Sequence, residues 1–127
     1  MSTIFSKIIS GEIPAYKIYE DDYVCAFLDI NPVHKGHTLV VPKIEVDDFL
    51  KLDEIMYDKV MHRVRYVALV IKGRLGCKRV VMLVEGYDIP HAHMHLIPTN
   101  SGDDFDKKNI YKATNEELNE MQKLLQS

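Results

Sequence analysis

The sequence is poor in cysteine and has no run of basic residues, and each absence narrows the classes of protein to which it can belong. Its two cysteines, Cys25 and Cys77, lie far apart and no secretory leader precedes them, so we expect reduced thiols and a cytoplasmic protein. The formal net charge is −3, and lysine and arginine are dispersed along the chain. Neither a nucleic acid nor an anionic membrane is therefore expected as the main partner.

The chain also lacks a long hydrophobic run, a low-complexity tract and an internal repeat. The apolar stretch from Val67 to Ile71 is too short to span a bilayer, so no membrane partner is expected. With 46% hydrophobic and 28% charged side chains, the composition is that of an ordinary globular protein. The length of 127 residues is enough for one hydrophobic core, and we predict one domain over residues 1–127.

One pattern stands out from this ordinary composition: His91, His93 and His95 occupy alternate positions. In a strand, successive side chains point to opposite faces and rise roughly 3.3 Å per residue, so alternate imidazoles share a face about 6.6 Å apart. Two of them are then close enough to contact one phosphoryl group. The pattern predicts an active site on an extended strand.

Imidazole suits this chemistry because its reference pKa of roughly 6.5 leaves an unprotonated nucleophile and a protonated donor available together near neutral pH. His93, with a histidine on each side, is the predicted nucleophile, and a phosphoramidate formed on it would need no metal. A zinc site is the main alternative for the same residues, since H-x-H on a strand can hold zinc. Asp88 lies nearby, but no cysteine pair completes such a site. A purely structural triad is the third alternative.

Hydrophobic periodicity and turn residues predict three helices and five strands. The helices are expected at residues 4–9, 53–72 and 114–125, and the strands at 17–20, 24–28, 37–42, 79–84 and 91–98. This order indicates an α+β fold, with an antiparallel sheet and helices on one face. The continuous apolar run at 79–84 predicts a strand buried on both faces. Thr114 and Glu117 are spaced as a capping box for the terminal helix.

The segment His91-Ala92-His93-Met94-His95-Leu96-Ile97 resembles the H-φ-H-φ-H-φ-φ signature, with φ apolar, of the histidine triad (HIT) family of nucleotide-binding proteins and nucleotide hydrolases. Segments similar to the N-terminal half of that family occur in order at residues 4–9, 11–14, 26–32 and 36–43. The resemblance covers about 4–98 and implies a single HIT domain, followed by a C-terminal loop and helix at 99–127. It also implies a homodimer in which two five-stranded antiparallel sheets become continuous.

The resemblance further implies a nucleotide pocket. Apolar side chains would surround the base: Ile4, Phe5, Ile8, Phe27, Ile30 and Leu39. Asp29 would accept hydrogen bonds from the ribose hydroxyls, and His37 would approach the triad and help to position the nucleophile. Each apolar residue could instead be simple core, and Asp29 could only begin the turn before Pro32.

This chain departs from the family pattern just before the triad. The family often has Gly-Gln-Ser or Gly-Gln-Thr there, whose side chains donate to phosphate, whereas this chain has Gly86-Tyr87-Asp88-Ile89-Pro90. Ionised Asp88 cannot donate, so we hypothesise that it orients or charges a triad histidine. The Cys-x-x-Cys of some bacterial members is absent, and Glu45 replaces a frequent histidine, so no structural zinc is expected.

These observations favour a nucleotide hydrolase or nucleotidyl transferase without a cofactor. It would cleave the α-phosphate linkage of purine nucleotide derivatives: nucleoside phosphoramidates, adenylates or dinucleoside polyphosphates. A covalent nucleotidyl intermediate would form on His93, with His95 and His91 as acid and orienting partners. From another class, the alternative is a nucleotide-binding or scaffold module whose hydrolysis is incidental. A metal-dependent hydrolase is the third reading.

Overall fold

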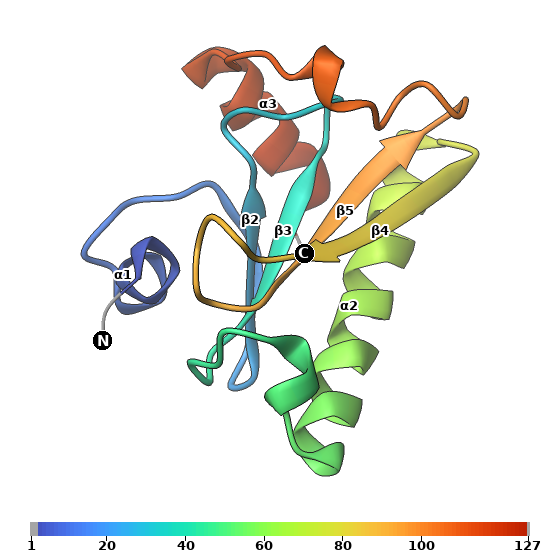
Figure 1. The fold of residues 1–127 in the computed structure, drawn as a ribbon. Helices are drawn as coiled ribbons and strands as arrows, with labels where there is room; N and C mark the ends of the chain where they lie inside the picture. Colours follow the sequence, from blue (N-terminus) through green and yellow to red (C-terminus); the bar gives the residue numbers. More distant parts are fainter. Residues whose placement is uncertain (1–2, 127) are drawn as a thin grey trace.

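The computed structural model describes residues 3–126, which form a five-stranded antiparallel sheet in the order β1-β2-β3-β5-β4 (Figure 1). The strands are β1 (Lys17–Glu20), β2 (Val24–Leu28), β3 (Thr38–Pro42), β4 (Arg79–Glu85) and β5 (His93–Thr99). The helices are α1 (Ile4–Ser10), α2 (Glu54–Leu75) and α3 (Asn115–Leu125), with two short 3₁₀ turns, η1 (Phe49–Lys51) and η2 (Lys107–Asn109). The predicted antiparallel α+β fold is confirmed.

The two longer helices, α2 and α3, share one face of the sheet, as the sequence predicts. Alternate residues of the central strands bury against them, and the resulting core comprises Val24, Ala26, Val40, Met94 and Leu96 with Val60, Val64, Val67, Ile71, Leu118 and Leu125. The terminal helix therefore packs on its own chain.

Helix α1 lies on the opposite face, apart from α2 and α3 (Figure 1), so the prediction that the helices share one face is right for α2 and α3 and wrong for α1. A second apolar cluster joins it to the sheet and consists of Phe5, Ile8, Cys25, Phe27, Leu39 and Val41. Thr3 and Ser6 form a capping box at its start, and Gly11 ends it with φ 88°. Because strands β2 and β3 are covered on both faces, the second face offers an enclosed position for ligand-binding side chains.

Strand β4 is not buried on both faces, contrary to the prediction. Among the described residues it pairs only with β5, which makes it an edge strand. Met82 and Leu83 are 49% and 41% exposed. A continuous apolar run indicates only that both faces of a strand favour burial, and another chain can supply the surface that buries them.

Several element ends differ from the predicted ones for local reasons. Helix α2 continues through Gly73 to Leu75. Gly76 is its C-cap, and its φ of 65° lies in the left-handed region. Strand β5 begins at His93, so His91 precedes the strand. Thr114 caps α3, but the Glu117 carboxylate accepts a hydrogen bond from the Tyr111 hydroxyl.

Over residues 3–126, no helix has both the length and the apolar character that a bilayer span requires.

Candidate active site

A cavity of about 360 Å³ lies between α1 and the adjoining face of the sheet. Its walls include all six apolar residues predicted to surround a base, together with Asp29, Glu85, Asp88, His93 and His95. Ile4 and Ile30 are 48% and 55% exposed, which is unusual for core side chains and fitting for the mouth of a binding site. The structure thus brings the predicted apolar wall together with two of the three triad histidines.

His91 does not line this cavity, because the chain buries its ring completely. Its Nε2 donates to the carbonyl of Pro42 at 2.8 Å, and its Nδ1 lies 3.1 Å from the hydroxyl of Thr3. Both ring nitrogens are therefore occupied. His91 ties the start of α1 to the end of β3, and it has no nitrogen left for a substrate or for a zinc ion held by three histidines.

His93 has the opposite arrangement, with one ring nitrogen bonded and one available. Its Nδ1 lies 2.8 Å from the backbone carbonyl of His91, which can only accept, so the proton sits on Nδ1. In the neutral ring, Nε2 then carries a lone pair. The ring of Phe5 packs edge-on against that of His93, with centroids 4.8 Å apart. His93 is thereby held in one tautomer and one orientation.

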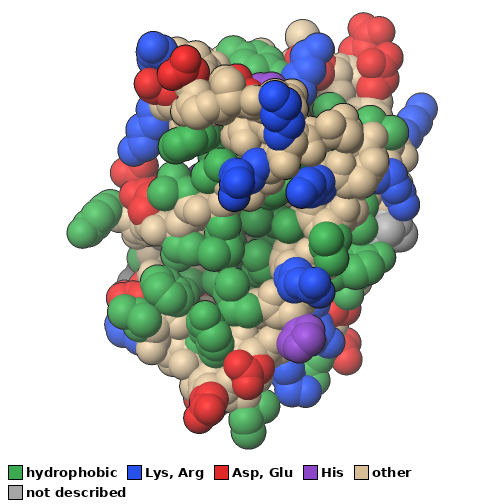
Figure 2. Space-filling model, turned by 90° about the vertical axis from the view of Figure 1, so that its right-hand side faces the viewer, with side chains coloured by type: hydrophobic (Ala, Val, Ile, Leu, Met, Phe, Trp, Pro, Cys, Tyr) green, Lys and Arg blue, Asp and Glu red, His purple; other side chains and the backbone are tan. Residues whose placement is uncertain are grey.

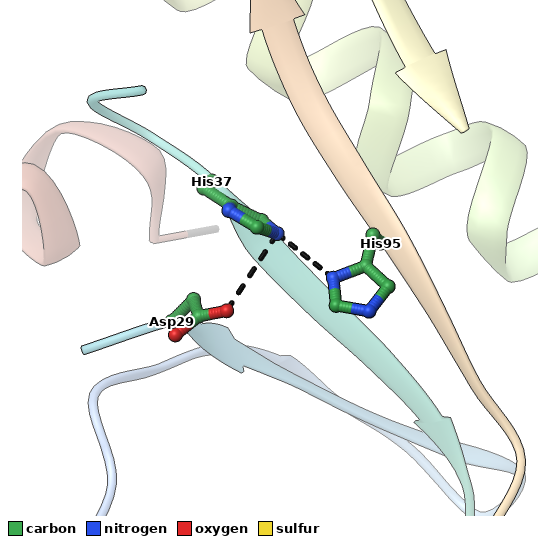
Figure 3. A group of neighbouring side chains, drawn as sticks. All are labelled: Asp29, His37 and His95. Carbon is green, nitrogen blue, oxygen red and sulfur yellow. Dashed lines mark hydrogen bonds and ion pairs between the residues drawn. The ribbon is translucent and has the colours of Figure 1, made fainter. Parts of the chain in front are cut away.

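The proton on His95 is fixed by a longer chain of hydrogen bonds, part of which is drawn in Figure 3. The amide of Val33 donates to Nδ1 of His37 at 3.2 Å, so the proton of His37 sits on Nε2. That Nε2 donates to Nδ1 of His95 at 2.9 Å. His95 must therefore keep its own proton on Nε2, the nitrogen on the other side of its ring.

Electrostatics favours these neutral forms of His37 and His95. Burial, and to a lesser extent His95, lowers the pKa of His37 to about 3. Burial and the neighbouring His93 lower the pKa of His95 to about 4. Both rings are uncharged near neutral pH in the unliganded protein, so they act there as hydrogen-bonding groups and not as cations.

Asp29 serves the turn and borders the cavity at once, so the two roles considered for it are compatible. Its Oδ1 accepts the amide of Asn31 at 2.9 Å, and its Oδ2 lies 3.7 Å from Nε2 of His37 (Figure 3). Burial raises the pKa of this carboxyl group. A carboxylate held in this way at the cavity wall suits the recognition of hydroxyl donors.

Two acidic residues, Glu85 and Asp88, lie near the triad, and the sequence analysis identified only Asp88. Asp88 is exposed at the cavity wall, and among the described residues no hydrogen bond or ion pair joins it to a histidine. Glu85 is the register partner of His93 across β4 and β5. One of its oxygens and one nitrogen each of His93 and His95 lie within 4.8 Å of one another. The alternation of β4 could have suggested Glu85 only if its register against β5 had been known.

Two groups of side chains have the spacing of possible cation ligands, and both include His95. One contains Glu85 and His93, and the other contains Asp29 and His37. In the second group the facing nitrogens of His37 and His95 are bonded to each other. Neither group contains His91, so the three-histidine form of the zinc alternative does not fit the geometry.

A model of the HIT domain matches residues 10–102. The chain belongs to the histidine triad family. An uncharacterized HIT-like protein of Methanocaldococcus jannaschii is 43% identical over 107 residues, which cover 79% of this chain and 81% of that protein. An adenylylsulfatase of Arabidopsis thaliana is 32% identical over 105 residues, covering 79% of this chain and 53% of the plant protein.

The same family relationship is evident in three dimensions. The crystal structure of a hypothetical histidine triad nucleotide-binding protein from Sulfolobus tokodaii matches with a TM-score of 0.85 at 34% identity, covering 96% of this chain and 88% of that one. Membership of the histidine triad family and these relatives support nucleotide hydrolase-type activity.

Proposed function

We propose that the protein hydrolyses nucleotide derivatives at the α-phosphate in two steps, with a nucleotidyl group carried transiently on His93. The observation that carries this proposal is the hydrogen bond from Nδ1 of His93 to the His91 carbonyl, which leaves Nε2 with a free lone pair. His93 lines a cavity whose volume, about 360 Å³, is in the range of small-molecule sites. A tautomer fixed by the backbone removes one of the ordering costs of nucleophilic attack.

The cavity wall suggests how a nucleotide would lie. The base would lie against the apolar wall to which Phe5 of α1 and Phe27 of β2 contribute, where few polar atoms distinguish one purine from another. The ribose hydroxyls would donate to Asp29. The α-phosphate would then reach His93 and His95, which lie at the same wall with ring centroids 5.0 Å apart.

In the first step, Nε2 of His93 forms a bond to phosphorus and the bond to the leaving group breaks. An anionic phosphate beside His95 raises the pKa of that ring, so the ring can take up a proton on binding and give it to the leaving group. In the second step, water attacks phosphorus and gives a proton back to His95, the P–N bond breaks with its electron pair returning to Nε2 of His93, and a nucleoside monophosphate is released. His37 acts through His95 as a positioning residue.

Charge favours some of the candidate substrates over others. The cavity wall carries three carboxylates, Asp29, Glu85 and Asp88, and no lysine or arginine among the described residues. Since His37 and His95 are neutral in the unliganded site, little positive charge opposes them. Nucleoside phosphoramidates and adenylates therefore suit this site better than dinucleoside polyphosphates, which bring several further negative charges.

The test is hydrolysis of adenosine 5′-phosphoramidate in the presence of a chelator. We expect His93→Ala to lose at least about 10³-fold in kcat while it still binds adenosine monophosphate, because only the nucleophile is missing. Wild-type protein quenched during turnover should carry one adenylyl group on the peptide that contains the triad. His62→Ala, altered at an exposed histidine, is the matched control.

Three results would contradict this proposal. Unchanged turnover in His93→Ala would exclude the nucleophile. Activity lost in chelator and restored by zinc would favour a metal-dependent hydrolase. Tight binding of the monophosphate without measurable turnover in the wild type would favour the binding-module alternative.

We also propose that two copies of the chain pair across β4 and α2. The outer edge of β4 has no strand beside it among the described residues. Both elements carry exposed apolar side chains, among them Ile55 and Leu69 of α2 and Met82 and Leu83 of β4. Figure 2, which views the α2 and β4 side, shows hydrophobic side chains gathered at the centre of this face with charged ones around them. Such a patch is typical of an interface.

A further inference from the structure

Within residues 3–126, Glu85 is the only residue that lines both the proposed nucleotide cavity and a second cavity beside it. The second cavity, of about 470 Å³, lies between the loop at 47–51 and the segment at 84–92. Among the described residues, Glu85 has no hydrogen bond or ion pair. The two-step mechanism does not use this carboxylate, although it faces the two reacting histidines.

Two carboxylates mark different sides of the phosphate position. Asp29 groups with His37 and His95, whereas Glu85 groups with His93 and His95, and no single group holds both carboxylates. If the ribose lies at Asp29, the remaining substituent on phosphorus lies on the Glu85 side. In-line displacement requires the leaving group to depart away from Nε2 of His93, and with the ribose side held at Asp29 its path runs past Glu85, which borders the second cavity.

The second cavity has an apolar lining with acidic groups at its edge. Its apolar side chains are Phe49, Leu50, Val84, Tyr87, Pro90 and Ala92. Its one lysine, Lys51, is paired with Asp47 at 2.7 Å. The side chain of Asp48 accepts the Leu50 amide and caps η1. Glu85 is left as the carboxylate that can meet a ligand charge at the junction of the two cavities.

A carboxylate in this position repels an anionic leaving group and attracts a cationic one. We propose that Glu85 selects substrates whose leaving group is an aliphatic amine with a second, positively charged ammonium group, and that the second cavity receives that group. This inference rests on the proposed function, because it takes His93 as the nucleophile and Asp29 as the ribose contact. It assigns Glu85 as a specificity-determining residue and the second cavity as a leaving-group site.

The experiment compares two adenosine 5′-phosphoramidates that differ only in charge, one with an N-(4-aminobutyl) group and one with an N-butyl group. We expect wild-type protein to prefer the aminobutyl substrate by about tenfold in kcat/KM, with the preference falling as salt is added. Glu85→Gln should reduce the ratio to near one, and Glu85→Asp should keep part of it. Glu54→Gln, at an exposed glutamate of α2, is the matched control and should retain the full ratio.

The outcomes separate this inference from the function on which it rests. If both substrates are cleaved equally well by the wild type, or if Glu85→Gln keeps the preference, the role of Glu85 is wrong and the hydrolase stands. If neither substrate is cleaved, the proposed function itself fails. Circular dichroism of each variant shows that a changed ratio comes from folded protein.

Discussion

The roles of the histidines are set, residue by residue, by the backbone groups that each ring meets. A carbonyl can only accept and an amide can only donate, so the carbonyl of His91 fixes the proton of His93, and the amide of Val33 fixes that of His37. His91 itself is removed from the chemistry because Pro42 and Thr3 occupy its nitrogens. In the proposed mechanism, identical side chains thus have one nucleophilic, one donating and one structural role.

His37 should matter for turnover more than for substrate binding, because it reaches the substrate only through His95. We expect His37→Leu to lower kcat about 10²-fold with a small change in KM, since an unrestrained His95 no longer holds its donor in place. His37→Gln, whose amide nitrogen can take the place of the ring Nε2, should recover part of the loss. Steady-state kinetics on adenosine 5′-phosphoramidate provides both constants.

His34→Gln is the matched control for this prediction, because His34 is partly exposed and its ring nitrogen Nδ1 lies at hydrogen-bond distance from the carbonyl of Lys35 and not from the triad. A His37→Leu variant with wild-type kcat, or a Gln variant no better than Leu, would show that the hydrogen bond to His95 has no part in catalysis.

At the scale of the element, short turns decide where the site residues point. The amide of His37 donates to the carbonyl of His34 at 3.0 Å, and Gly36 within this turn has φ 89°. The turn lies against the end of α2 and against β5, because a Cβ on Gly36 would come within 2.7 Å of Leu75 Cδ1 and 3.0 Å of Pro98 Cγ. A left-handed residue without a side chain is required directly before His37.

Substitution of this glycine should therefore destabilise the protein. We expect Gly36→Ala to lower the free energy of unfolding by roughly 2 to 4 kcal/mol, combining backbone strain with overpacking. Gly73→Ala is the opposite case, since Gly73 is inside α2 with nothing within 4 Å of an added Cβ. That change should stabilise by about 0.5 to 1 kcal/mol. Urea denaturation measures both, and equal stability of the two variants would contradict the packing argument.

The register between β4 and β5 also determines which side chains point into the site. It places Glu85 opposite His93 and Leu83 opposite His95. A shift by one residue would turn Glu85 away from the histidines and replace it at the cavity with an apolar side chain. The specificity proposed for the leaving group thus depends on one strand pairing.

At the scale of the whole molecule, the two faces of the sheet have different roles. One face packs against α2 and α3 and forms the core, while the other face and α1 form the cavity in which we propose that the nucleotide binds. The exposed edge of β4 and the outer surface of α2 remain available to a second copy. Pairing there would leave α1 and the cavity mouth on the opposite side of each chain.

The proposed dimer can be tested by a substitution that leaves the cavity unchanged. Leu69 of α2 is 52% exposed, and it does not line the cavity. Because a two-fold interface contains every substitution twice, we expect Leu69→Glu to weaken the dimer at least tenfold. Sedimentation velocity at micromolar concentration measures the mass of the wild type and of the variant. Leu124→Glu, at a similarly exposed leucine of α3, should leave the dimer intact, and a monomeric wild type would remove the proposal.

The elements themselves, and the two histidines at the centre of the site, follow from local patterns. Alternation predicts that His93 and His95 share a face, and the left-handed glycines after α1 and α2 end those helices where the residue type leads one to expect it. These features depend on neighbours a few positions away, for which residue preference and periodicity are sufficient.

Contacts between distant residues could not be read in the same way. His37 and His95 are 58 positions apart, and only the pairing of β3 with β5 brings their rings together. The order and register of the strands likewise decide that His91 is buried away from the cavity, that Glu85 lies opposite His93, and that β4 is at the edge of the sheet. The sequence by itself determined that His93 and His95 share a face; the tertiary structure decided that His91 is withdrawn and that Glu85 approaches, because both depend on groups contributed by other elements.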